Sequence, residues 1–480
     1  MSPSTITSRT GAASLAAHWR RWRSPLAVGI GAASAAVAAG LATIASGNFA
    51  AQRPVFLLAL PLALLLLFSF LLAPKLLVAA ILVLRACLDP IFLNAQLPGI
   101  GGLGGLVNVA IIGLAALLVL RDPARVPRWA WLLWLPYLGV QLLGLAYAPE
   151  TLAALRQFLG RLATGSVFVL AFHLVDDRRS FKRMLHIVLA SSLPVIAYTL
   201  LAIARGDSYT VLDGPSGGST RYAGPFGHPN ILAFYLVLVM GVMLCLRRPD
   251  GGPRKLAPAL AGAAYWGLLL LLLFATKTRS AWIAAALLFL VYGWFVERRF
   301  LLYLAASPLL ALLVPEVRDR VLEIGQASAY PNSSGQNSFE WRRQMWSDAL
   351  GWMRPARYLL GYGLNSFVVY SAQFFSLSYG KAFGAHSVPV QQFFELGLPG
   401  LASFFHLFLG SLRRIASIWS LDRPVAVVFV AQVLCYLIVS FSDNMLDYLT
   451  FNWYFWFAIG AVCRLAAIGA PPPAPAGPAG

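Results

Sequence analysis

His386 is the residue in this sequence whose type and position best suit proton transfer. It follows a long polar stretch and is the first polar residue of a new apolar segment, AHSVPVQQFFELGLPGL. An imidazole has an unperturbed pKa of about 6.5, so it can take up or release a proton near neutral pH. The chemistry predicted for His386 is general base catalysis, and the alternative is a plain hydrogen bond to the backbone at a segment end.

Cationic side chains recur in the polar stretches of the chain, and guanidinium groups in such a setting favour anion binding. Arg221 precedes His228 in RYAGPFGHPN, Lys277 and Arg279 share the tight corner ATKTRSAW, and Arg342 lies in SFEWRRQMWSDALGWM. A guanidinium presents paired N–H groups that match phosphate oxygens. We therefore expect a mobile anionic substrate. In the alternative interpretation, these arginines face water or the phosphates of membrane lipids.

The composition identifies the environment in which these residues must work. Of the 480 residues, 59% are hydrophobic and only 11% are charged, whereas soluble globular proteins have about 25% charged residues. Apolar runs of about 17–25 residues recur along the chain, which is the length of a helix that crosses a bilayer. The net charge of +19 comes mainly from short loops between these runs, so no nucleic-acid partner is expected. The sequence predicts an integral membrane protein in contact with membrane lipids.

The fold class expected is all-α, with about 12–14 transmembrane helices, because lipid offers the backbone no hydrogen-bond partners. The first apolar run, near 25–46, is interpreted as a retained helix and not as a signal peptide, since it is long and has no clear cleavage site. Further helices are expected near 54–72, 74–94, 103–120, 129–147, 154–175, 182–204, 229–247, 256–276, 280–296, 299–314, 386–410, 424–441 and 446–468.

The distribution of lysine and arginine predicts which loops stay in the cytoplasm. With a cytoplasmic N-terminus, the inner loops are 121–128, 176–183, 247–255, 297–299 and the loop with Arg413, Arg414 and Arg423. His228 and His386 then both lie on the outer side. A cation within a span, such as Arg161, costs about 2.5–3.5 kcal/mol on insertion, so it is expected to be paired or functional.

The expected organisation has five parts. These are a cytoplasmic tail (1–24), transmembrane helices with an outer loop at 205–228 (25–314), a large periplasmic loop (315–385), C-terminal transmembrane helices (386–468) and a disordered tail (469–480). In the large loop, Trp341, Met345, Ala349 and Met353 recur every four residues. This spacing predicts an amphipathic helix that lies on the membrane or caps a cavity.

No metal ion or cofactor is expected. The outer side has no DxD motif or acidic cluster, and the chain has no P-loop or HExxH motif. Arginines can neutralise a diphosphate leaving group, which is the task that a divalent metal ion performs in many transferases.

Four stretches, in this order, give the chain a resemblance to a known family. RYAGPFGHPN (221–230), TKTRSAW (276–282), WRRQMWSDAL with LLGYGLNSF (341–367) and HSVPVQQFFELGLPGL (386–401) resemble the O-antigen ligase family. That family belongs to a larger group with O-antigen polymerases and pilin oligosaccharyltransferases. The resemblance covers roughly the C-terminal half, and the first half is similar only as a string of apolar segments. It implies a helical membrane protein that resembles the GT-C-type glycosyltransferases.

The resemblance also implies a role for the motif residues. The residues implied at the diphosphate are Arg221, Arg279, Arg342 and Arg161. Arg161 is the weakest match, because it is a lone arginine in an apolar segment. Lys277 and His228 are secondary candidates, and His386 would act on the acceptor hydroxyl. Thr278 stands where the family usually has a smaller residue, which is a mild departure.

The implied reaction transfers a glycan from undecaprenyl diphosphate to lipid A-core at the periplasmic face of the bacterial inner membrane, in lipopolysaccharide biosynthesis. A single displacement would invert the anomeric centre. An O-antigen polymerase or a protein O-oligosaccharyltransferase would use the same donor with another acceptor. A polysaccharide flippase or transporter is disfavoured, because few charges lie deep in the spans beyond Arg85, Arg156 and Arg161.

Overall fold

The structure is a computed structural model that describes residues 72–90, 96–97, 101–211, 219–247, 256–312 and 338–469. The chain divides into two compact units, Met1–Ile81 and Leu82–Gly480, and the fold described below is that of the second. The expected tail at 1–24, the expected helix near 25–46, nearly all of the helix near 54–72 and the disordered tail after Gly469 lie outside the described residues.

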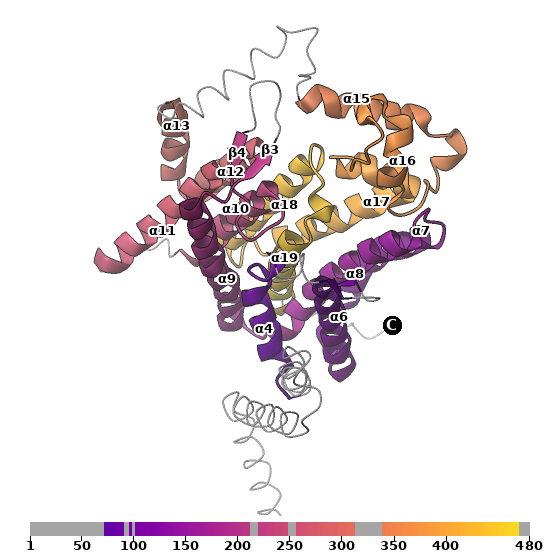
Figure 1. The fold of residues 1–480 in the computed structure, drawn as a ribbon. Coiled ribbons are helices and arrows are strands. Elements are labelled where there is room, and N and C mark those ends of the chain that lie inside the picture. Colours follow the sequence, from indigo (N-terminus) through magenta and orange to yellow (C-terminus); the bar gives the residue numbers. More distant parts are fainter. Residues whose placement is uncertain are drawn as a thin grey trace, which may run out of the picture. The chain divides into compact units, whose positions relative to one another are not determined.

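Fourteen α-helices are described, and the all-α expectation is confirmed (Figure 1). The helices before the large loop are α4 (Pro74–Arg85), α6 (Leu103–Arg121), α7 (Arg128–Ala146), α8 (Thr151–Leu174), α9 (Arg178–Arg205), α10 (Pro229–Leu246), α11 (Leu256–Ala275), α12 (Arg279–Phe295) and α13 (Arg299–Leu312). They are followed by α15 (Ser338–Trp352), α16 (Ser366–Phe374), α17 (Val388–Ala416), α18 (Arg423–Ser440) and α19 (Leu449–Gly469).

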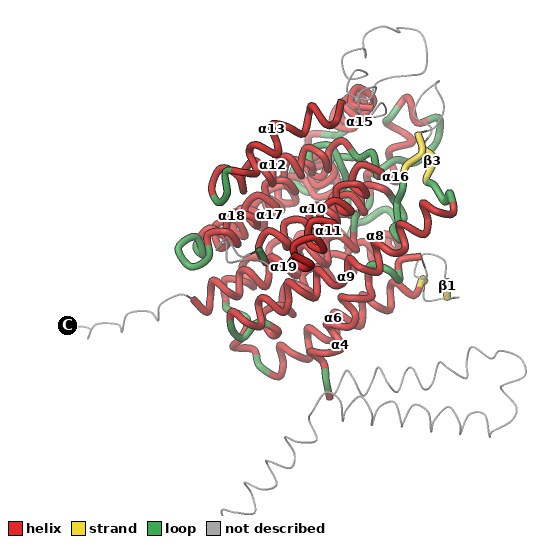
Figure 2. Tube along the Cα trace, turned by 90° about the vertical axis from the view of Figure 1, so that its left-hand side faces the viewer, coloured by secondary structure: helices red, strands yellow, loops and turns green. Residues whose placement is uncertain are grey.

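The strands form two short antiparallel hairpins among the described residues (Figure 2). One pairs β1 (Gln96–Leu97) with β2 (Gly101–Gly102), and the other pairs β3 (Tyr209–Val211) with β4 (Ser219–Arg221). Eight described helices are long and apolar enough to cross a membrane, and α11 and α12 are shorter apolar helices. The protein is therefore a multi-pass membrane protein.

Helix α19 forms the centre of the second unit, and its sequence LTFNWYFWFAIG is apolar apart from Thr450 and Asn452, which are also buried. It packs most extensively on α8, while α12 packs on α18 and α17 packs on α7. Trp453 and Trp456 of α19 are fully buried, and the ring of Trp456 meets that of Trp134 edge-on at 4.8 Å. Aromatic packing thus fixes how α7, α8 and α19 lie against one another.

Ion pairs join the loops that the charge pattern assigns to the cytoplasm. The pairs are Arg125–Asp176, Arg178–Asp422 and Arg247–Glu297. Arg464, near the end of α19, donates to the carbonyls of Val175 and Arg125. Helices α10 and α19 run towards this basic end, and α18 runs away from it. The polar segments that precede α10, α17 and α19 therefore gather at the opposite end.

This separation of the two ends allows a test of orientation. Ser376, between α16 and α17, and Ser420, between α17 and α18, are both exposed. In a background with serine at the half-buried Cys87 and Cys245, we expect a membrane-impermeant thiol reagent to label Ser376→Cys from the periplasm and to spare Ser420→Cys in spheroplasts. Labelling of Ser420→Cys without labelling of Ser376→Cys would contradict the predicted orientation of the protein.

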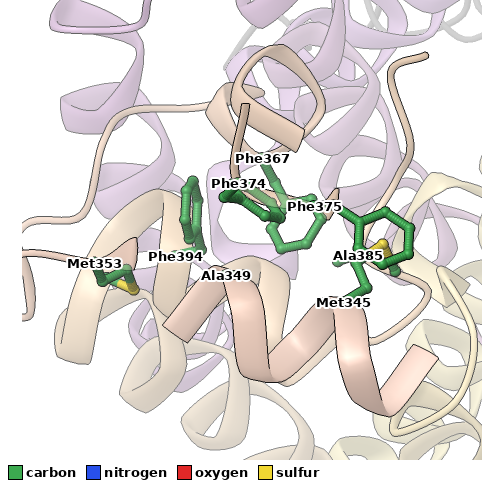
Figure 3. Close-up of a cluster of buried hydrophobic side chains, with 8 residues drawn as sticks. All are labelled: Met345, Ala349, Met353, Phe367, Phe374, Phe375, Ala385 and Phe394. Carbon is green, nitrogen blue, oxygen red and sulfur yellow. The ribbon is translucent and has the colours of Figure 1, made fainter. Parts of the chain in front are cut away.

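The described part of the large loop is folded and packs against α17. The apolar face of α15, formed by Met345 and Ala349 and continued by Met353 just after the helix, lies on a cluster of phenylalanines that includes Phe367 and Phe394 (Figure 3). All five side chains are at least 97% buried. A helix is present at the expected place, and its apolar face covers protein.

A break in α17 explains the glycines of the GYGLN segment. Gly397 has φ 66° and ψ −157°, and Pro399 lacks the N–H that would bond to the Glu395 carbonyl. That carbonyl accepts from Gly363 N–H at 2.8 Å instead. A Cβ on Gly361 would collide with the backbone of Glu395. The glycines therefore let residues 361–363 reach the broken turn, which anchors the end of the large loop on α17.

Candidate functional site

The segment between α18 and α19, residues 442–448, connects the polar residues at the end of the bundle opposite the basic loops. We call it the 442–448 turn. It receives a hydrogen bond from Arg342 of α15 to Ser442 O at 2.7 Å and one from Asn230 of α10 to Asp443 Oδ2 at 2.8 Å. Arg161 of α8 forms an ion pair with Asp447 at 2.6 Å. One short turn therefore holds three distant parts of the chain.

Arg221 ends the strand β4 and lies at the corner between α11 and α12. Its Nε donates to Thr276 O at 2.8 Å, and its Nη2 donates to Asn230 Oδ1 at 2.8 Å and to Thr278 Oγ1 at 2.9 Å. These bonds use the planar fork of the guanidinium, which a lysine cannot reproduce. The half-buried cation is thereby tied to both the TKTR corner and the start of α10.

Asn230 connects Arg221 to the buried carboxylate of Asp443. Its side-chain oxygen accepts from Arg221, while its amide nitrogen donates to Asp443, which is 2% exposed. Tyr448 donates to the other carboxylate oxygen at 2.5 Å. Burial raises the pKa of Asp443, although the hydrogen bond from Tyr448 and the nearby Arg342 act in the other direction. Asp443 thus accepts hydrogen bonds from Asn230 of α10 and from Tyr448 at the end of the 442–448 turn.

His228 caps the N-terminus of α10. Its Nδ1 accepts from the backbone N–H of Asn230 at 3.1 Å, and its ring stacks on Tyr448 with centroids 6.4 Å apart. Burial lowers the pKa of His228 to about 4, and the neighbouring Arg221 adds to this effect. The imidazole is therefore neutral at physiological pH.

His386 lies just before α17 in an unusual backbone conformation, with φ +47°. A side chain in this left-handed region costs roughly 1–2 kcal/mol, and such strain is concentrated at functional sites. Trp346 holds the conformation by donating to Ala385 O at 2.7 Å, and the ring of Trp341 meets the imidazole edge-on at 6.0 Å. No described residue forms a hydrogen bond with the imidazole of His386.

Helix α15 joins His386 to the 442–448 turn, because Trp341 contacts the imidazole and the next residue, Arg342, donates to Ser442 O. Burial is the main cause that lowers the pKa of His386 to about 4, and the charge of Arg342 contributes. Arg342 also acts on Asp443. The structure therefore brings Arg221, His228, Arg342 and His386 around the 442–448 turn, and this group forms the candidate site.

The two cations of the TKTR corner have different environments. Lys277 is half-buried with φ +50°, while Arg279 is exposed and is the first residue of α12. Both are adjacent in sequence to Thr278, which Arg221 contacts. They lie beside the candidate site, at the start of α12.

Arg161 lies deeper than expected for a residue that contacts a substrate. It is 6% exposed, and its Nη atoms are committed to Leu446 O and Asp447. Its guanidinium also lines a small cavity with Trp134, Tyr137 and Asn452. Arg161 therefore holds the 442–448 turn in place, and a contact of Arg161 with a diphosphate stays a prediction.

Sequence reasoning missed the central role of Asn230, Asp443 and Tyr448. Asp443 lies outside the four stretches that resemble the O-antigen ligase family. Its signal is the polar run SDNMLDY between two apolar segments, because buried polar residues at the end of a helix pair need partners. Among the described residues, no three His, Cys, Asp or Glu side chains come together as potential metal ligands.

The fold and the site define a class of protein, namely a multi-pass α-helical membrane protein with a cationic, histidine-containing site at one end of the bundle. The family model described as O-antigen ligase matches residues 264–405. The resemblance to the O-antigen ligase family is thereby confirmed over α11 to α17, and it supports a glycan-transfer enzyme of the ligase or polymerase type. A search of curated proteins found no match.

The lowered histidine pKa values predict a pH dependence of stability. The folded chain keeps His228 and His386 neutral down to about pH 4, whereas the unfolded chain binds protons at the ordinary pKa of 6.5. The unfolded state thus binds more protons between these values, so stability falls as pH falls from 6.5 towards 4. We expect the thermal unfolding midpoint to drop across this range, and to drop less in His386→Asn. An equal drop in the variant would contradict a buried neutral His386.

Proposed function

We propose that the protein is an O-antigen ligase. It transfers a glycan from undecaprenyl diphosphate to lipid A-core at the periplasmic face of the bacterial inner membrane. The observation that supports this proposal most is that Arg342 binds the 442–448 turn directly, Arg221 reaches it through Asn230, and His386 contacts Trp341, the neighbour of Arg342. The family match over residues 264–405 points to the same class of chemistry.

In the proposed reaction the acceptor hydroxyl loses its proton to His386 as its oxygen attacks the anomeric carbon of the donor glycan. The bond from that carbon to the diphosphate oxygen breaks, and its electron pair leaves with the diphosphate. Arg221 and Arg279 stabilise the charge that develops there, with support from Arg342, and no metal is required. A single displacement inverts the anomeric centre.

The charge of the donor makes His386 a better base when the donor is bound. Arg342 helps to keep the pKa of His386 at about 4 in the free enzyme. A bound diphosphate offsets this positive charge, and a nearby anion favours the protonated form of histidine. The pKa of His386 then rises towards neutral pH, where a general base is most effective.

Reconstitution with defined substrates tests the function. The purified protein is incubated with undecaprenyl diphosphate-linked glycan and lipid A-core in EDTA, without nucleotide. We expect glycan on lipid A-core at a rate that added Mg²⁺ does not raise. Glycan found instead on a second lipid-linked repeat or on a protein acceptor would identify a polymerase or a protein oligosaccharyltransferase. Loss of activity in EDTA that Mg²⁺ restores would reject the metal-free mechanism.

A further inference from the structure

The cap at the start of α10 decides which nitrogen of His228 carries the proton. His228 has an extended backbone, with φ −152° and ψ 140°, and its Nδ1 accepts from Asn230 N–H at 3.1 Å. A nitrogen that accepts a hydrogen bond has no proton of its own, and a neutral imidazole has one protonated nitrogen. The proton of His228 therefore lies on Nε2.

The surroundings of the ring keep it in this form. Adding a proton at Nδ1 would remove the cap of α10 and would place a second cation beside Arg221. Tyr448 stacks on one side of the ring, with 16° between the planes, and Tyr209 meets it edge-on at 5.4 Å. These contacts fix the direction of the Nε2–H bond.

His228 is linked to Arg221 through Asn230, whose side-chain oxygen accepts from Arg221 and whose backbone N–H donates to His228 Nδ1. Its ring also stacks on Tyr448 of the 442–448 turn, and the same turn binds Arg342 of α15, the helix whose Trp341 contacts His386. The bond that breaks during transfer must lie between the diphosphate and the acceptor hydroxyl. A fixed N–H group in this position can donate to the oxygen on which negative charge develops.

We propose that His228 is a neutral hydrogen-bond donor that uses Nε2–H to stabilise the leaving diphosphate oxygen, and that it is not a base. The proton stays on Nε2 throughout, because Nδ1 is occupied by the cap. The two histidines thus have opposite roles, since His386 must present an unprotonated nitrogen to the acceptor hydroxyl. This inference rests on the proposed function.

Two substitutions separate the cap from the donor. In His228→Asn, the amide oxygen replaces Nδ1, and asparagine is a good N-cap, but no group reaches the position of Nε2. In His228→Gln, the amide nitrogen reaches that position and the cap is weakened. We expect His228→Asn to keep a thermal midpoint near that of wild type and donor affinity within about threefold, while turnover falls about 10²–10³-fold. His228→Gln should be less stable and more active than His228→Asn.

The order of the two variants distinguishes this role from a structural one. A histidine that only caps α10 would make His228→Asn the better variant in both stability and turnover, and that result would overturn the proposal. Failure of the wild-type protein to transfer glycan in the reconstituted assay would reject the proposed function itself, and this is seen before any variant is compared.

The tautomer can be observed without any activity. The full chain is labelled with [15N]histidine in lipid nanodiscs, and the His228 signals are identified by their loss in His228→Asn. We expect an unprotonated Nδ1 and a protonated Nε2 from about pH 5.5 to 8, because burial and Arg221 hold the pKa of His228 at about 4. A proton on Nδ1, or a cationic ring at pH 6.5, would overturn the proposal.

Discussion

Replacing His386 with alanine is expected to lower turnover by about 10²–10⁴-fold, which is the usual effect of removing a general base. Donor binding should change little, because His386 is proposed to meet only the acceptor hydroxyl, while the arginines bind the diphosphate. The measurements are the donor dissociation constant and the transfer rate of protein whose folding has been verified. A rate within about threefold of wild type would remove His386 from the mechanism and leave positioning by the arginines.

The strained backbone of His386 requires a matched control. Alanine is unfavourable at φ +47°, so His386→Ala can lose stability as well as the imidazole. Asparagine is among the residues that best tolerate this conformation. We expect His386→Asn to be more stable than His386→Ala and equally inactive. If His386 only anchors the start of α17, His386→Asn should instead be active per folded molecule.

Replacing Arg221 with lysine is expected to weaken donor binding by about 10–100-fold and also to slow transfer. A hydrogen bond to a charged group contributes about 1.5–3 kcal/mol, and an ammonium cannot satisfy Thr276 O, Asn230 Oδ1 and Thr278 Oγ1 in the geometry of the guanidinium. The measurement is the affinity for the lipid-linked donor together with single-turnover rates. Unchanged donor affinity would separate Arg221 from the diphosphate.

Arg279 provides the comparison for this effect. It is exposed at the first position of α12, whereas Arg221 is half-buried and donates to Thr276 O, Asn230 Oδ1 and Thr278 Oγ1. We expect Arg279→Lys to retain more activity than Arg221→Lys, with losses below about tenfold. Equal losses would show that the paired N–H groups of arginine matter at both positions. The hydrogen bonds of Arg221 to Thr276, Asn230 and Thr278 would then not explain the loss in Arg221→Lys.

The helices were predictable because a bilayer demands long apolar runs, and nearly every described run forms a helix. The boundary of α4 was less predictable. A span was expected near 74–94, but α4 ends at Arg85, where Arg85 forms an ion pair with Asp89. Asp89 also accepts from Thr450 at 2.6 Å. An apolar run shows where a chain can be helical, while the end of that helix depends on partners more than 300 residues away.

The candidate site was predictable to the extent that the type and position of a single residue indicate its chemistry. Arginines on the outer side and a histidine at a segment boundary are unusual enough to be noticed without a structure. The function of Asn230 could not be predicted in this way, because it depends on a contact with Asp443, which is 213 positions away. Arg161 is the opposite case. Its guanidinium is a group that suits a phosphate, but in the structure it bonds to Leu446 O and Asp447.

The central position of α19 has a consequence for how the protein is made. Synthesis proceeds from the N-terminus, so Leu449–Gly469 is the last described helix to enter the membrane. Until it arrives, α8 lacks its main packing partner and Arg161 lacks Asp447. Pairs such as α6 with α8 and α7 with α17 pack without α19, but the site is complete only when the 442–448 turn is in place. Insertion of α18 and α19 is then the step at which a nascent chain becomes a competent enzyme. If the ribosome stalls before this step, the incomplete chain is left for membrane proteases to remove.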